Sequence, residues 1–220
     1  MKIVSSGHGL KVAGASSVYM DEVTEARKVV NRVSELCKEM GDPITIFHEN
    51  VATTVKGNLS NIVSFHNSKS GTHDVSIHFN SFNGSASGVE VFGYDNGTKA
   101  LGEKICSGLS SVMGIPNRGF KINTGLRFLN STKKPAILIE VCFLDNEKDA
   151  TSYKRNFEKV CIVIAEALTG KTYKPSTPTP PPTSDQLFAV CVGAYTRPNA
   201  DKILEEVKAK GYKDAYLIAR

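Results

Sequence analysis

The 220-residue chain lacks the features that mark several large classes of protein. It has no run of about 18 or more apolar residues, so a transmembrane helix is not expected. The opening residues MKIVSSGHG contain no apolar core of a signal peptide. Neither a GxGxxG nor a GxxxxGK[ST] loop occurs, which argues against a nucleotide-binding α/β protein. We therefore expect a protein made in the cytoplasm without a signal peptide and without membrane insertion.

Paired cysteines and blocks of charge are also missing. The five cysteines form no CxxC pair, and most lie in apolar surroundings. They predict free, buried thiols in a reducing compartment and no disulfide framework. The net charge is +5, but the basic residues are scattered, so nucleic acid is not indicated as a partner. A mild positive charge suits an anionic polymer such as a bacterial cell wall.

Proline, by contrast, is concentrated in one stretch. More than half of the nine prolines lie within residues 171–186, among threonines and serines. A segment of this composition stays extended and cannot join a core. The sequence therefore predicts a large domain over 1–170, a linker over 171–186 and a small module over 187–220.

Within 1–170, short apolar runs alternate with amphipathic stretches. Strands are predicted at KIVSS, PITIFHE, HDVSIHFN, SGVEVFGYD, GLRFLN and PAILIEVCFL. Helices are predicted at 21–41, 56–69, 97–114 and 147–170. This alternation is typical of a three-layer α/β domain, with a mostly parallel twisted sheet between helices. Ligands of such domains bind at the carboxyl ends of the strands.

Polar side chains stand where several of these strands end. His8 follows KIVSSG, His78 and Asn80 end HDVSIHFN, and Glu140 lies late in PAILIE. Glu22 begins the first long helix, and a glycine-containing loop can return it toward His8. Two imidazoles and one carboxylate at one sheet edge form a ligand set for catalytic zinc with an open fourth position. Glu140 would be the carboxylate that binds no metal.

These residues also have ordinary structural interpretations. Most histidines bind no metal, and a glutamate after an apolar run can pair with a lysine at the surface. Asp21 and Glu25 compete with Glu22, because all three suit the first turn of a helix. Structural roles are expected for the remaining histidines His48, His66 and His73.

Four motifs follow one another over about residues 2–168. They are IVSSGHG, an acidic residue at a helix start, SIHFN and AILIEVCFLDN. In this order they resemble the motifs of zinc-dependent N-acetylmuramoyl-L-alanine amidases. The resemblance implies His8, Glu22 and His78 as zinc ligands and Glu140 as the catalytic carboxylate.

The resemblance also implies a reaction and a partner. The bond cleaved would be the amide between N-acetylmuramic acid and L-alanine of peptidoglycan, of the Gram-positive type. Zinc would activate a water molecule, and Glu140 would carry its proton to the leaving amine. Asn80 would fix the loop that follows His78. Leu10 and Cys142 stand where the family has glycine, and the Cys142 thiol is expected to point into the core.

The compact first domain and the missing signal peptide resemble phage endolysins, which reach the wall through a holin lesion. Two alternatives stay open. One is another zinc amide hydrolase, such as a carbohydrate deacetylase or a peptidase. The other is a non-catalytic wall-binding protein that keeps the metal site only for stability.

Residues 187–220 form a strand–helix–strand pattern, in which Pro198 and Asn199 start the helix and Gly211 ends it. The pattern resembles one βαβ repeat of the sporulation-related (SPOR) peptidoglycan-binding domain, which normally has two. A single repeat implies either a truncated chain or pairing between two copies as a homodimer. A docking tail without a ligand is the alternative.

Overall fold

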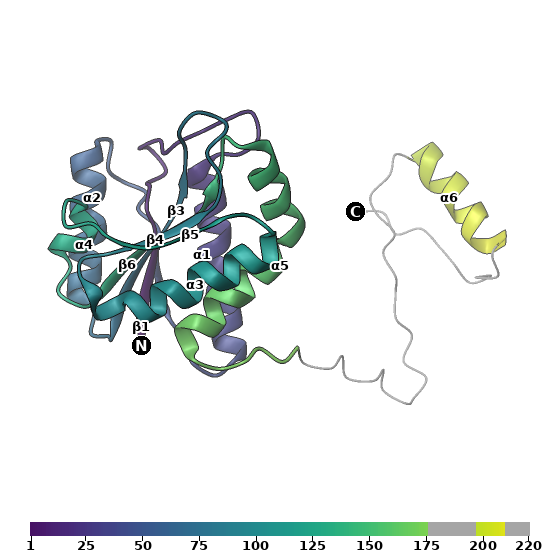
Figure 1. Ribbon diagram of the computed structural model, residues 1–220. Helices are drawn as coiled ribbons and strands as arrows, with labels where there is room; N and C mark the ends of the chain where they lie inside the picture. The colour runs from purple at the N-terminus through teal and green to yellow at the C-terminus, as the bar shows by residue number, and fades with distance from the viewer. Residues whose placement is uncertain (176–196, 210–220) are drawn as a thin grey trace. The chain divides into compact units, whose positions relative to one another are not determined.

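The structure is a computed structural model that describes residues 1–175 and 197–209 (Figure 1). Residues Met1–Pro175 form one compact unit, and Ser176–Arg220 form a second. In the second unit the described element is helix α6 (Arg197–Ala209), at the place where a helix was predicted. The two predicted tail strands and most of the linker lie outside the described residues. No helix in the described ranges is long and apolar enough to cross a membrane.

A six-stranded sheet in the order β2-β1-β3-β6-β4-β5 forms the centre of the first unit. The strands are β1 (Lys2–Ser6), β2 (Thr45–Phe47), β3 (His73–Asn80), β4 (Val89–Gly93), β5 (Asn117–Ile122) and β6 (Ala136–Phe143). Strands β2, β1, β3 and β6 run parallel to one another. Strand β4 is antiparallel to β6, and β5 is parallel to β4. The predicted α/β class is confirmed, with a mixed sheet that is parallel at most of its pairings.

Helices cover both faces of this sheet (Figure 1). They are α1 (Glu22–Glu39), α2 (Val55–Ser68), the 3-10 turn η1 (Asn96–Thr98), α3 (Lys99–Met113), α4 (Arg127–Ser131) and α5 (Glu147–Thr169). Helices α1, α3 and α5 pack on one face, and α2 and α4 pack on the other. Helix α1 buries Val29, Val33 and Leu36 completely, because their spacing of three to four residues places them on one side of the helix.

One predicted strand is wrong, and one strand was not predicted. The segment GLRFLN contains helix α4, in which the adjacent residues Phe128 and Leu129 are both buried. Neighbouring residues of a strand point to opposite faces, so this burial suits a helix. The missing strand is β5, NRGFKI, at the edge of the sheet. Gly119 has a φ of +81°, and the β4–β5 register shifts beside it, so the alternation of a regular strand is broken.

The strands β1, β3 and β6 end at the same edge of the sheet, which we call the carboxyl edge. In the registers of the neighbouring pairs, Ser6 lies beside Ile77 and His78 beside Glu140. Strand β4 runs the other way, so its beginning lies at this edge, with Glu90 beside Glu140. The carboxyl edge therefore collects residues from both the ends and the beginnings of strands.

Candidate metal centre

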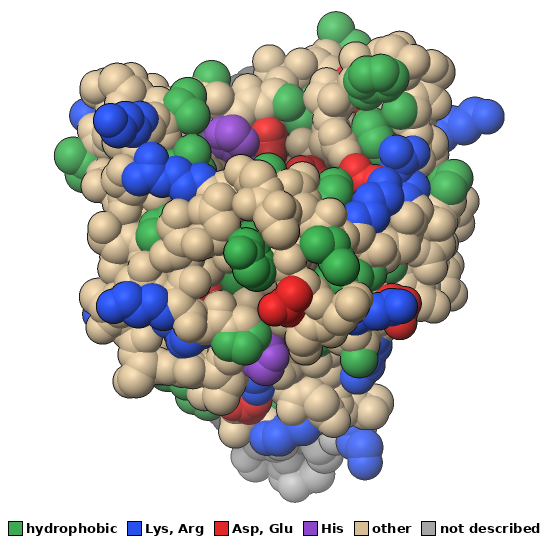
Figure 2. Space-filling view, turned by 60° about the vertical axis from the view of Figure 1, so that its left-hand side comes forward, with side chains coloured by type: hydrophobic (Ala, Val, Ile, Leu, Met, Phe, Trp, Pro, Cys, Tyr) green, Lys and Arg blue, Asp and Glu red, His purple; other side chains and the backbone are tan. Residues whose placement is uncertain are grey.

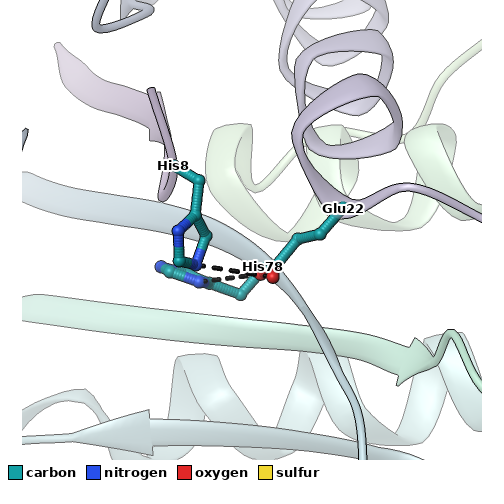
Figure 3. Close-up of side chains that lie close together, drawn as sticks. All are labelled: His8, Glu22 and His78. Carbon is teal, nitrogen blue, oxygen red and sulfur yellow. Dashed lines mark hydrogen bonds and ion pairs between the residues drawn. The ribbon is translucent and has the colours of Figure 1, made fainter. Parts of the chain in front are cut away.

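Three side chains with metal-binding groups converge at the carboxyl edge. They are His8 in the loop after β1, Glu22 at the start of α1 and His78 in β3 (Figure 3). One potential ligand atom from each lies within 4.8 Å of the other two. The structure thus brings together the three residues that the sequence singled out as a ligand set.

Glu22 stands between the two imidazoles. Its Oε1 lies 3.1 Å from His78 Nδ1, and its Oε2 lies 3.4 Å from His8 Nε2 (Figure 3). The backbone N–H groups of Phe79 and Ala15 donate to Oε1 and Oε2, respectively. Burial opposes ionisation of Glu22, but the hydrogen bond and charge of His78 and the charge of His8 hold its pKa below the ordinary value. Glu22 is therefore an ionised carboxylate in a fixed position.

The two acidic neighbours of Glu22 have other contacts. Asp21 is the N-cap of α1, and its side chain accepts from the backbone N–H of Thr24. Glu25 forms an ion pair with Lys28 at 2.8 Å. Of the three acidic candidates, Glu22 is the one that the structure places against the imidazoles.

Two glycines allow this close packing. A Cβ atom on Gly7 would lie 1.9 Å from the Nε2 and Cε1 atoms of the His78 ring. A Cβ atom on Gly14 would lie 2.6 Å from Glu22 Oε2. Both distances are far below van der Waals contact, so any side chain at these positions would displace a residue of the site. Sequence reasoning noticed the glycine-containing loop but not these particular requirements.

Sequence reasoning also missed Ser76. Its hydroxyl group is buried and lies 3.0 Å from His78 Nε2, while Nδ1 of the same ring faces Glu22. A partner of this kind fixes the orientation of an imidazole ligand. The signal was present in the motif SIHFN, because residues two apart in a strand share one face of the sheet.

Glu140 lies directly beside this group of three residues. It is the cross-strand partner of His78, and its Oε2 is buried without a hydrogen-bond partner among the described residues. Burial raises the pKa of Glu140 to about 7; the charges of Glu22 and Glu90 add to the rise, and His78 opposes it. A carboxyl group with a pKa near neutrality can both accept and donate a proton there. Perturbed groups of this kind concentrate at functional sites.

Asn80 bonds to Glu90 and to the first residue of the loop that follows β3. Its amide donates to Glu90 Oε1 at 2.7 Å, and its carbonyl oxygen accepts from the backbone N–H of Ser81. In the part of the chain that the structure describes, no hydrogen bond joins Asn80 to the His78 side chain. The Asn80 side chain therefore links the end of β3 to β4.

Leu10 and Cys142, which stand where the motifs discussed above have glycine, leave the group of three residues intact. Leu10 is exposed in the loop after His8. Cys142 is a free thiol buried in the main core, as predicted. The register between β3 and β6 shifts after His78, so β6 is not a regular strand beyond Glu140. This irregularity lets Glu140 and Cys142 face different surroundings although they are two residues apart.

The structure places other histidines in structural contacts. His66 is fully buried, with Nδ1 2.8 Å from Asp74 Oδ1 and Nε2 3.0 Å from Ser5 Oγ. This is the residue combination of a serine hydrolase, but all three side chains are shielded from solvent, so it joins α2 to β1 and β3. His48 bonds to Ser6 Oγ at 3.0 Å. Neither histidine contacts the candidate metal centre.

Comparison with protein families gives a match over nearly the whole first unit. Residues 3–169 match the family model described as N-acetylmuramoyl-L-alanine amidase. An uncharacterized cell wall amidase of Bacillus anthracis is 32% identical over 162 residues, which is 67% of this chain and 30% of the relative. An uncharacterized protein of Clostridium perfringens is 29% identical over 78% of this chain and 52% of its own length. The chain thus spans from under a third to about half of these curated relatives.

Solved structures share the fold. The catalytic domain of the CD27L endolysin targeting Clostridia difficile superposes with a TM-score of 0.73 at 26% identity, over 79% of this chain and 99% of that domain. Cwp6 from Clostridium difficile gives 0.68 at 24% identity, over 77% of this chain and 29% of that one. The catalytic domain of the amidase CwlV from Bacillus (Paenibacillus) polymyxa gives 0.64 at 24% identity, over 77% and 97% of the two chains.

Proposed function

The chain belongs to the N-acetylmuramoyl-L-alanine amidase family, and on this premise we propose that it hydrolyses the amide between N-acetylmuramic acid and L-alanine in peptidoglycan. One observation carries the proposal. His8, Glu22 and His78 converge beside Glu140, whose Oε2 atom is buried without a hydrogen-bond partner among the described residues. This arrangement lies within the matched residues 3–169.

The three converging residues fit zinc by their chemistry. Two imidazoles and one carboxylate are the ligand types of catalytic zinc, and three protein ligands leave a position open. His8, Glu22 and His78 would hold the ion. When bound, zinc supplies a water of lowered pKa and polarises the substrate carbonyl. Ser76 would fix the His78 ring, and the backbone N–H of Ala15 would fix Glu22.

Glu140 would perform the proton transfers. Since burial raises its pKa to about 7, a large share of molecules at neutral pH carries the ionised form. That form would accept a proton from the attacking water and then donate it to the nitrogen of the leaving L-alanine. No protein group among the described residues competes for its Oε2 atom by a hydrogen bond.

We also propose a biological setting. Similarity to an endolysin catalytic domain supports a phage or prophage endolysin, made in the cytoplasm and released to a Gram-positive wall through a holin. Residues 171–186 would link the catalytic domain, 1–170, to a SPOR-like wall-binding repeat at 187–220. Pairing of single repeats between two chains would give a homodimer.

The test compares the wild type with Glu140→Gln and with Glu103→Gln, an exposed position on α3. Zinc content is measured by elemental analysis, and products from purified cell walls are identified by mass spectrometry. We expect one zinc per chain in all three proteins, new L-alanine amino termini from the wild type and the control, and a loss of at least about 100-fold in Glu140→Gln.

Other outcomes would contradict the proposal in distinct ways. Near-normal activity of Glu140→Gln would remove Glu140 from the proton transfers. Release of acetate without new amino termini would identify a deacetylase. Zinc binding without cleavage of any wall would identify a wall-binding protein.

A further inference from the structure

A hollow of about 260 Å³ lies beside the candidate metal centre at the carboxyl edge. Its lining comes from the end of β3, the following loop, and the beginnings of β4 and β5, and it includes Asn80, Phe82, Glu90, Arg118 and Phe143. Glu90 is in register with Glu140 across β4 and β6. Neighbouring strands are about 4.8 Å apart, so the hollow begins one strand away from the proposed proton carrier.

Two basic side chains share the carboxylate of Glu90, one in the lining of the hollow and one outside it. Glu90 is buried, and its carboxylate bonds to both Arg118, at 2.8 Å, and Lys121. Burial opposes ionisation of Glu90, but the two basic partners outweigh it and hold the pKa of Glu90 below its ordinary value. The lining therefore holds one cation, Arg118, and one anion, Glu90, and Lys121 adds a further cation beside the hollow. On the upper part of the face in Figure 2, acidic side chains lie between a histidine and a group of Lys or Arg side chains.

Arg118 is held in place yet accessible. Its Nε donates to Glu90, its Nη1 donates to the Ser87 carbonyl oxygen at 3.5 Å, and its guanidinium lies 5.0 Å from the centre of the Phe143 ring. The side chain is 36% exposed. A guanidinium has five N–H donors, and these bonds use two of them within the described residues. The remaining donors of a fixed guanidinium suit a carboxylate ligand.

Phe82 adds an exposed aromatic ring to the rim of the hollow. Phe82 is 78% exposed, although Asp145 Oδ2 accepts from the backbone N–H groups of both Phe82 and Gly84. A large apolar side chain presented on a fixed loop beside a cation is suited to contact a peptide ligand. The loop therefore provides apolar contact next to the charge of Arg118.

A second hollow, of about 440 Å³, lies on the other side of the metal centre, at the end of the outer strand β2. Its lining includes Phe47, Asn50, Asn61 and Phe65, and it has no lysine or arginine among the described residues. The lining of this second hollow thus lacks a cation such as the one that Arg118 supplies to the first, although Arg27 bonds to Asn50 Oδ1 from outside the lining. An asymmetric substrate with one anionic arm would be oriented by this difference.

We propose that the hollow around Arg118 binds the first free carboxylate of the stem peptide, and so places the peptide arm of the substrate over β4 and β5. This inference rests on the proposed function. In peptidoglycan the residue after L-alanine is D-glutamate linked through its γ-carboxyl, which leaves its α-carboxyl free or amidated. One residue spans at most about 3.6 Å, so a carboxylate two residues from the cleaved bond matches the distance of one to two strands from Glu140.

The test uses the full chain and two substrates that differ only at this group: N-acetylmuramoyl-L-alanyl-D-glutamate and its D-isoglutamine counterpart. We expect the wild type to hydrolyse the carboxylate form with a kcat/KM about tenfold higher, since a charge-assisted hydrogen bond is lost in the amide. Arg118→Gln should bring the ratio close to one, and Arg118→Lys should keep part of the preference. The control Arg155→Gln changes the same charge at an exposed position on α5 and should keep the full ratio.

The ratio of kcat/KM for the two substrates distinguishes a role of Arg118 in substrate recognition from a merely structural role. A merely structural role for Arg118 would lower kcat/KM for both substrates equally, and an unchanged ratio in Arg118→Gln would overturn the proposal. Equal hydrolysis of both substrates by the wild type would overturn it as well, while the proposed function stood.

Binding of the products, L-alanyl-D-glutamate and L-alanyl-D-isoglutamine, is measured by calorimetry in parallel. If neither substrate is hydrolysed but the dipeptide carboxylate binds in an Arg118-dependent way, the amidase function fails and the carboxylate site stands. If neither hydrolysis nor binding is seen, the proposed amidase function and the proposed carboxylate site are both wrong.

Discussion

Replacing Gly7 with alanine should damage the candidate metal centre more than any comparable change in the same loop. The new Cβ would lie 1.9 Å from Nε2 and Cε1 of His78 and 2.5 Å from Nδ1. Ordinary contact needs roughly 3.4 Å, so the ring would have to move by about 1.5 Å. Such a shift would stretch its hydrogen bonds to Glu22 and Ser76, now 3.1 and 3.0 Å, beyond bonding distance.

The expected magnitude follows from these losses. Two hydrogen bonds worth about 0.5–1.5 kcal/mol each, together with local overpacking of about 1–3 kcal/mol, should lower the free energy of unfolding by about 2–6 kcal/mol. Misplacement of one ligand should weaken zinc binding by at least the 10–100-fold typical of losing a supporting contact. Gly125→Ala is a suitable control, because its added Cβ would meet Asn123 Oδ1 at 3.4 Å, an ordinary contact.

Two measurements check this reasoning. Denaturant unfolding with chelator present reports the stability of the metal-free protein, and competition with a zinc chelator reports affinity. Gly125→Ala should behave like the wild type in both. If Gly7→Ala binds zinc with wild-type affinity, the His78 ring is not a ligand in the position described, and the proposed metal centre would have to be abandoned.

Two further predictions concern the surroundings of the same site. Ser76→Ala should weaken zinc binding about tenfold through loss of the contact that orients His78, whereas Ser76→Thr, which keeps the hydroxyl, should restore part of it; equal affinity in all three proteins would exclude the orienting role. In metal-free protein the raised pKa of Glu140, about 7 against 4.5, means that stability is highest while the carboxyl is protonated in both states. As pH rises from about 4.5 to 7, the wild type should lose roughly 3 kcal/mol relative to Glu140→Gln, as measured by unfolding across this pH range; parallel profiles would show that the carboxyl is not buried as described.

The convergence of His8, Glu22 and His78 could be predicted because it depends on local rules that act together. His8 and His78 follow or end apolar strands, and parallel neighbours bring such positions to one edge of the sheet. The choice of Glu22 over Asp21 needed the motif order, since helix capping favours either residue. The structure resolves it physically: Asp21 caps the helix, and Glu22 turns inward to the imidazoles.

Elements with weak local signals could not be predicted. Strand β5 has few buried residues and a glycine of positive φ, so it shows neither alternation nor an apolar run. Helix α4 is five residues long, and its Phe128 and Leu129 resemble a strand in sequence. In both cases tertiary contacts, and not intrinsic preference, decide the secondary structure.

The antiparallel direction of β4 explains why Glu90 and Arg118 were not predicted from the sequence as neighbours of the site. The rule that ligands gather at carboxyl ends of strands selects His8, His78 and Glu140, which all lie on parallel strands or just after them. Because β4 is antiparallel to β6, and β5 follows β4, the beginnings of these strands face the same edge. Glu90 therefore lies beside Glu140, and Arg118 bonds to Glu90 from the next strand, although both residues precede apolar segments. In the two proposals made above, the parallel strands would supply the groups for bond cleavage, and the reversed strands would supply Arg118, which would distinguish one arm of the substrate from the other.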